Sequence, residues 1–257
     1  MHRTWSILLA LVVATLLHLP ARAGGDRAQQ ALRRRGAELR QLLASRGLPL
    51  PPREIFIRAF KRERLLEVWA REQGPAFQRL LSVPFCAASG ELGPKRQSGD
   101  LQVPEGFYHL QRFNPASSFH LSLGLDYPNA ADRRRARARG GAALGGDIFL
   151  HGGCASIGCI AITDEKIELV YLLAVGARGR GQRQIPVHVF PSRLDDDGWA
   201  WLRAHHGGQP ALVGFWESLR SGYQHFERRR RLPRLRVDAR GSYQVGSFDL
   251  ESAEARR

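Results

Sequence analysis

A nine-residue stretch, HGGCASIGC at positions 151–159, gathers the side chains of this sequence that are best suited to covalent chemistry. It combines His151 with Cys154, Ser156 and Cys159, and glycines separate them. Three uses compete for such residues: a zinc site, a disulfide or an activated nucleophile. We do not favour Ser156 as a nucleophile, because it has no better-placed base than Cys159 has.

A metal centre fits the spacing poorly. Structural zinc takes four ligands, commonly from C-x-x-C or H-x-x-x-H pairs, and this stretch offers three ligands without that spacing. Cys86 would have to supply the fourth. We therefore expect no metal.

The chain has three cysteines, so at least one thiol stays unpaired within it. A Cys154–Cys159 disulfide would close a small loop and add modest stability. A Cys86–Cys154 disulfide would instead fix the long loop after Cys86 and leave Cys159 free. Both pairings remain open at this point.

The nucleophile interpretation explains most of the stretch. An imidazole such as that of His151 can accept the thiol proton of Cys159 and later return it to a leaving amine. The glycines allow a tight return of the chain, and Gly158 could present a backbone N–H to a developing oxyanion. Acyl transfer by a Cys-His pair follows from this arrangement.

The sequence also resembles a known family, the YkuD-type L,D-transpeptidases, and in particular their YafK-like branch. The resemblance rests on HGGCASIGCIAI, which follows a short apolar strand, and on several further blocks in the same order. It covers most of residues 54–194. The further blocks are CAASGELGPK (86–95), GDLQVPEGFY (99–108), FNPASSFHLSLGLDYPN (113–129) and IPVHVFPSRL (185–194).

This resemblance implies an α+β fold with a mainly β L,D-transpeptidase core and helical additions at both ends. It implies Cys159 as nucleophile and His151 as general base and acid. Ser156, Gly158 and Gly152 match the small residues that shape the turn. Two departures, Ala161 in place of an arginine and a short gap between His151 and Cys159, leave substrate contacts and the acceptor open.

The resemblance further implies attack on the diaminopimelate carbonyl of a peptidoglycan stem peptide, without metal or organic cofactor. The resulting thioester passes to an amine. If water is admitted instead, the protein is a hydrolase, either an L,D-carboxypeptidase or an amidase that releases a peptidoglycan-linked envelope lipoprotein. Two alternatives to an acyltransferase or hydrolase belong to other classes of protein. One is a non-catalytic peptidoglycan-binding envelope protein, and the other is a redox protein that uses Cys154 and Cys159.

Three further residues lie in or beside the shared blocks and are candidates for substrate contact: His120, Tyr127 and Asn129. Each has a structural alternative. A histidine can satisfy hydrogen bonds in the fold, and an asparagine commonly stabilises a loop.

The N-terminus predicts export to the periplasm. A basic start, the apolar run 6–19 and the small-x-small site at 21–23 form a secretory signal peptide. An uncleaved membrane anchor is the alternative. The formal net charge of +15 is carried almost entirely by arginine, with runs at 133–139 and 228–236. We expect these runs to be solvated or to meet anionic envelope polymers or lipid headgroups, not nucleic acid.

The predicted organisation is a monomer with five parts. Strands are predicted at 54–60, 64–70, 77–85, 107–110, 118–125, 147–150 and 185–190, with a long loop at 86–106 and an exposed arginine-rich loop before 147. Helices are predicted at 28–45, 164–175, 194–204 and 210–226. The parts are a signal peptide (1–23), a helical segment and linker (24–52), the catalytic domain (53–192), C-terminal helices (193–227) and a basic, disordered tail (228–257).

Overall fold

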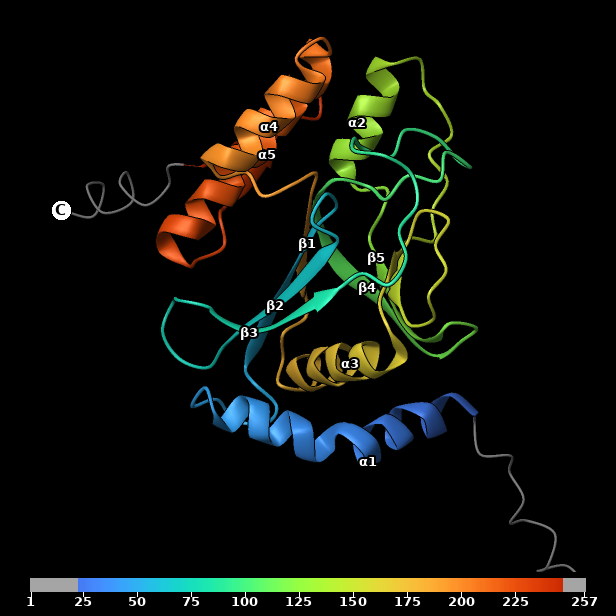
Figure 1. Cartoon of the computed structure of the whole chain (residues 1–257), viewed down its shortest axis with the longest axis vertical. Helices are drawn as coiled ribbons and strands as arrows, with labels where there is room; N and C mark the ends of the chain where they lie inside the picture. Colours follow the sequence, from blue (N-terminus) through green and yellow to red (C-terminus); the bar gives the residue numbers. More distant parts are fainter. Residues whose placement is uncertain (1–22, 247–257) are drawn as a thin grey trace, which may run out of the picture.

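The computed structural model describes residues 23–246 and shows a mixed β-sheet between layers of helices (Figure 1). Residues 1–22 of the predicted signal peptide lie outside the described residues, and its last residue, Ala23, begins α1. The helices are α1 (Ala23–Ala44), α2 (Ala130–Ala138), α3 (Asp164–Gly179), α4 (Asp196–His206) and α5 (Pro210–Arg229). The strands are β1 (Glu54–Phe60), β2 (Leu65–Arg71), β3 (Gln78–Pro84), β4 (Gly106–Ser117), β5 (His120–Leu125), β6 (Phe149–His151), β7 (Ile160–Ala161), β8 (Pro186–Phe190), β9 (Leu235–Val237) and β10 (Tyr243–Val245).

The main sheet has eight strands in the order β3-β2-β1-β8-β4-β5-β6-β7. Hairpins join β1 to β2 and β4 to β5 in antiparallel pairs. The pairs β1–β8 and β6–β7 are parallel. The short strands β6 and β7 therefore end the sheet on the side of β4 and β5, and the nine-residue stretch connects them.

Both faces of the sheet are covered, which explains why its central strands are almost continuously apolar. In β1, Ile57 and Ala59 pack into the cluster that includes α1 and α3, whereas Phe60 packs into the cluster of α4 and α5. Figure 1 shows α1 and α3 together on one side and α4 and α5 on the other. The fold class predicted from the sequence is confirmed: a mainly β core with helices at both ends.

One sequence prediction is wrong in the arginine-rich stretch, which forms α2 and not a loop. Asn129 and Asp132 make a capping box: the Asn129 side chain accepts from the Asp132 N–H, and Asp132 accepts from the Asn129 N–H. Arg135 is buried and binds Asp132 at 2.5 Å. The capping box and this ion pair stabilise a helix in spite of its run of like charges.

The predicted disordered tail is also wrong for the residues up to 246. Strands β9 and β10 form an antiparallel hairpin. The ring of Tyr243 in β10 is buried and lies edge-on to Phe107, with a centroid distance of 4.7 Å. Arg135 donates to the Gly241 carbonyl at 2.7 Å, which joins the hairpin to α2.

Within residues 23–246, none of the helices combines the length and apolarity needed to cross a membrane.

Candidate active site

Strands β6 and β7 bring the predicted nucleophile and base to one pocket. Their parallel register pairs Leu150 with Ile160 and His151 with Ala161. Cys159 directly precedes β7, so this register places it beside Phe149, two residues before His151 in β6. Cys159 and His151 both line a pocket of about 530 Å³ that the loop 86–105 and the β4–β5 turn enclose.

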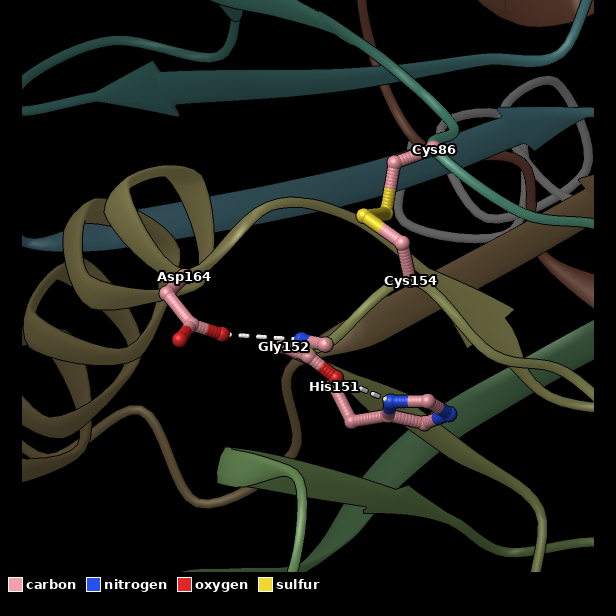
Figure 2. Close-up of a disulfide and its surroundings, with 6 residues drawn as sticks. Cys86, His151, Gly152, Cys154 and Asp164 are labelled. Carbon is pink, nitrogen blue, oxygen red and sulfur yellow. Dashed lines mark hydrogen bonds between the residues drawn. A yellow bond between two sulfur atoms is a disulfide. The ribbon is translucent and has the colours of Figure 1, made fainter.

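The imidazole of His151 is buried and held in one orientation. Its Nδ1 lies 2.6 Å from the Gly152 carbonyl oxygen. Figure 2 marks this hydrogen bond with a dashed line. A carbonyl only accepts, so Nδ1 carries the proton in the neutral ring and Nε2 is left as a proton acceptor. Burial lowers the pKa of His151, and the bond to Gly152 offsets this only partly. The ring is therefore neutral over a wider pH range than an exposed histidine.

The thiol of Cys159 is partly buried and is also neutral at rest. The Phe149 N–H donates to Sγ at 3.4 Å, and Sγ lies 3.8 Å from the Asp147 carbonyl oxygen. Burial raises the pKa of Cys159; the Phe149 N–H and Lys95 lower it, whereas Asp147 raises it. The raised thiol pKa and the lowered imidazole pKa both favour the uncharged Cys-His pair before substrate binds.

The turn between His151 and Cys159 requires small residues, because larger side chains would collide with neighbouring atoms. A Cβ on Gly152 would lie 2.5 Å from Asp164 Oδ1, and one on Gly158 would lie 3.1 Å from the Gln102 carbonyl oxygen, at a φ of +121°. The Gly153 N–H donates to Asp164 at 2.8 Å, which ties the turn to the start of α3 (Figure 2).

Ser156 holds the end of this turn. Its hydroxyl donates to the Cys159 carbonyl at 2.8 Å and lies 2.9 Å from the Ser89 hydroxyl in the long loop. It also accepts from the Gly158 N–H at 3.3 Å. The Gly158 N–H, which the sequence suggested as an oxyanion donor, is thus engaged within the turn.

All three cysteines lie in the described part of the chain, and they adopt one of the two pairings left open by the sequence. Cys86 and Cys154 form a disulfide, and Cys159 is free. Figure 2 shows the disulfide joining the segment after β3 to the turn that follows His151. The Cys86 N–H also donates to the Ala161 carbonyl at 3.0 Å, so this segment is fixed against β7 on the other side of the turn as well.

The pocket wall includes residues that the sequence did not single out. Lys95 is buried, with its ammonium 2.6 Å from Asp100 Oδ1, and three large apolar side chains at the pocket are exposed: Leu101, Phe119 and Ile157. Lys95 ends one of the blocks that carry the family resemblance. A single sequence does not show which apolar residues are exposed in the fold, so these three side chains could not be predicted to line the pocket.

The three lower-ranked candidates lie away from this pocket. His120 points to α3, with Nε2 2.9 Å from Glu168 Oε1. Tyr127 is buried, and its hydroxyl donates to the Leu144 carbonyl at 3.3 Å. Asn129 caps α2 and donates to the Phe107 carbonyl at 2.9 Å. Their contacts are those of residues that stabilise the fold.

The described residues contain no group of three or more His, Cys, Asp or Glu side chains that could hold a metal ion.

Comparison with known proteins defines the class to which this fold and pocket belong. Residues 54–189 match the YkuD family, the L,D-transpeptidase catalytic domain. The chain belongs to this family. It is 35% identical to YafK of Escherichia coli K12 over 193 residues. This match covers 74% of this chain and 73% of YafK.

Two solved structures resemble the chain at lower identity. The helical cell shape determining protein Pgp2 from Campylobacter jejuni is 19% identical with a TM-score of 0.43, over 76% of this chain and 77% of that chain. Bd1075 of Bdellovibrio bacteriovorus is 20% identical with a TM-score of 0.39, over 70% of this chain and 72% of that chain.

Proposed function

We propose that the protein is a cysteine-dependent peptidoglycan L,D-transpeptidase, with Cys159 as nucleophile and His151 as general base and acid. One observation carries the proposal: the free cysteine and a buried histidine with a fixed tautomer line the same pocket. Membership of a family that acts on peptidoglycan supports the substrate class.

The reaction begins from the neutral Cys-His pair. Nε2 of His151 accepts the thiol proton as Sγ attacks the diaminopimelate carbonyl of a stem peptide. The tetrahedral intermediate collapses, the terminal D-residue leaves with the proton from Nε2, and a thioester remains on Cys159. An acceptor amine then attacks the thioester, gives its proton to Nε2, and the thiol is regenerated.

The same thioester serves hydrolysis when water replaces the acceptor amine. An L,D-carboxypeptidase would release the terminal D-residue, and an amidase would release an attached envelope lipoprotein. The expected signal peptide places the protein in the periplasm, where either kind of substrate is found. We propose transpeptidation first and treat hydrolysis as an outcome of the experiment.

Chromatography of the products tests the proposal. Purified protein and its Cys159→Ala variant are incubated with defined tetrapeptide muropeptides and, separately, with lipoprotein-bearing sacculi. Crosslinked dimers formed by the parent alone indicate transpeptidation, whereas tripeptide or released lipoprotein indicates hydrolysis. Equal turnover by the variant would refute Cys159 as nucleophile.

A further inference from the structure

We infer that the N-terminal helix α1 is part of the catalytic unit. Its Arg27, together with Glu168 of α3, holds Phe119 over the imidazole of His151. Arg27 and Glu168 are then positioning residues, because they act through the β4–β5 turn (residues 117–120). The inference rests on the proposed role of His151 and adds a segment that precedes the residues matched by the family, 54–189.

The first contact is between two rings. Phe119 lies over His151 with a centroid distance of 4.7 Å and an angle of 34° between ring planes. The side chain of Phe119 is 47% exposed, whereas that of His151 is 3% exposed. The exposed ring of Phe119 thus covers part of the buried imidazole, and both residues line the pocket.

The second contact fixes the turn that carries Phe119. His120 adopts a φ of +66°, a conformation that residues other than glycine rarely adopt without support. Arg27 supports this conformation by binding the carbonyl groups at both ends of the turn. Arg27 donates to the Ser117 carbonyl at 2.5 Å and to the His120 carbonyl at 3.0 Å.

The third contact joins the turn to α3 and back to α1. Glu168 is 3% exposed and lies 2.9 Å from His120 Nε2. Arg34 and Arg35 of α1 bind its two carboxylate oxygens at 2.5 and 3.0 Å. Burial alone would raise the pKa of Glu168, but the bonds from Arg34, His120 and Arg35 outweigh it and lower the pKa. The carboxylate therefore stays charged and ties α1 to the turn.

The consequence is a defined environment for the base. With the turn in place, Phe119 excludes water from one face of His151, and burial lowers its pKa. Other charged or titratable groups surround the site: Cys159 and Asp147 in the pocket, Lys95 from the long loop and Asp164 at the start of α3. The substitutions below leave all four unchanged.

The test measures the titration of His151 directly, so it does not depend on turnover. The full chain is labelled at its histidines, and the His151 signal is assigned by its loss in His151→Gln. We compare Phe119→Ala and Arg27→Ala with Arg40→Ala, an exposed arginine on the same helix. Circular dichroism and thermal melting confirm that each variant is folded.

We expect the pKa of His151 to rise toward the ordinary histidine value, about 6.5, in Phe119→Ala and, to a lesser degree, in Arg27→Ala. Arg40→Ala should leave it unchanged. In the enzyme assay, Arg27→Ala should lower kcat roughly tenfold near pH 6, with a smaller change in KM, and recover part of the loss at pH 8.

Folded Phe119→Ala and Arg27→Ala variants whose His151 titrates as in the parent would overturn the inference. That result differs from failure of the proposed function, in which the His151 titration shifts as expected but Cys159→Ala keeps its activity. An equal effect of Arg40→Ala would also overturn the inference, because it would show a general influence of charge on α1.

Discussion

At the scale of single residues, the surroundings of Cys159 and His151 favour the uncharged form of both side chains. Burial raises the pKa of the Cys159 thiol and lowers that of the His151 imidazole. The spacing of HGGCASIGC singled out these two residues, and both line the pocket. It could not predict Phe119, because the position of that ring depends on a positive φ at His120 and on contacts from α1 and α3.

This uncharged pair predicts how Cys159 reacts with alkylating agents. In the free enzyme the rate of modification by iodoacetamide should rise with pH to a midpoint above that of an ordinary thiol, about 8.5. The acid limb of kcat/KM should lie below the ordinary histidine pKa of about 6.5, because His151 must be neutral to accept the proton. Alkylation quenched at fixed times and measured by mass spectrometry at each pH gives the midpoint of the Cys159 modification rate. A midpoint well below 8.5 would mean a resting thiolate–imidazolium pair.

At the scale of elements, the long strands of the core were predictable from the sequence, whereas α2, β9 and β10 were not. The strands of the core could be predicted from their apolar patterns, and β1 begins and ends at the predicted residues. Helix α2 was predicted as a loop because a run of like charges disfavours a helix; the N-x-x-D capping box and the Arg135–Asp132 ion pair offset that repulsion. Strands β9 and β10 were missed because each has three residues and is stabilised by packing of Tyr243 that no local pattern reveals.

The Cys86–Cys154 disulfide should contribute stability and order to the turn without taking part in the chemistry. It joins residues 68 apart in sequence, a closure worth up to about 4 kcal/mol in the chain-entropy account. The double variant Cys86→Ser/Cys154→Ser should melt at a lower temperature and lose roughly tenfold in kcat/KM while remaining active.

The matched control is Cys159→Ser, which should lose nearly all activity. Replacing both partners avoids a lone thiol that could pair with Cys159. If the folded double variant were as inactive as Cys159→Ser, the disulfide would belong to the reaction and the redox rival would gain support.

Asn129 provides a test of structural against substrate-binding roles. Asn129→Ala removes the N-cap of α2 and the bond to the Phe107 carbonyl, and should cost about 1–2 kcal/mol. Because Asn129 does not line the pocket, KM for muropeptides should be unchanged. Thermal unfolding and initial rates are compared with the parent. A raised KM at unchanged stability would instead place Asn129 in contact with substrate.

At the scale of the whole molecule, the long loop that walls the pocket is joined to the C-terminal helices through one carboxylate. Glu105 is fully buried and binds the Lys61 ammonium at 3.0 Å, the Gly93 N–H at 2.7 Å and the Trp216 indole N–H at 2.6 Å. These partners come from the β1–β2 turn, the loop and α5. The C-terminal helices are therefore packed against the loop that walls the pocket, and such long-range contacts were not predictable from a single sequence.

Glu105→Gln should destabilise the entire fold. The substitution keeps the shape but leaves the buried ammonium of Lys61 without its counter-charge, which typically costs about 3–5 kcal/mol. Urea unfolding should show one transition at lower denaturant, with Glu217→Gln, an exposed site on α5, close to the parent. A separate early transition of α4 and α5 would contradict this account of one packed unit.

The most direct test of the central claim is the mass of the intact protein during reaction with a tetrapeptide muropeptide. The reaction is stopped with acid, and the modified residue is located by proteolysis. We predict a gain in mass equal to the muropeptide less one free terminal D-amino acid, from an acyl group joined to Cys159 as a thioester, released by hydroxylamine and absent from Cys159→Ala. Product formation without such an adduct, or an adduct that persists in Cys159→Ala, would contradict the assignment of Cys159 as the nucleophile.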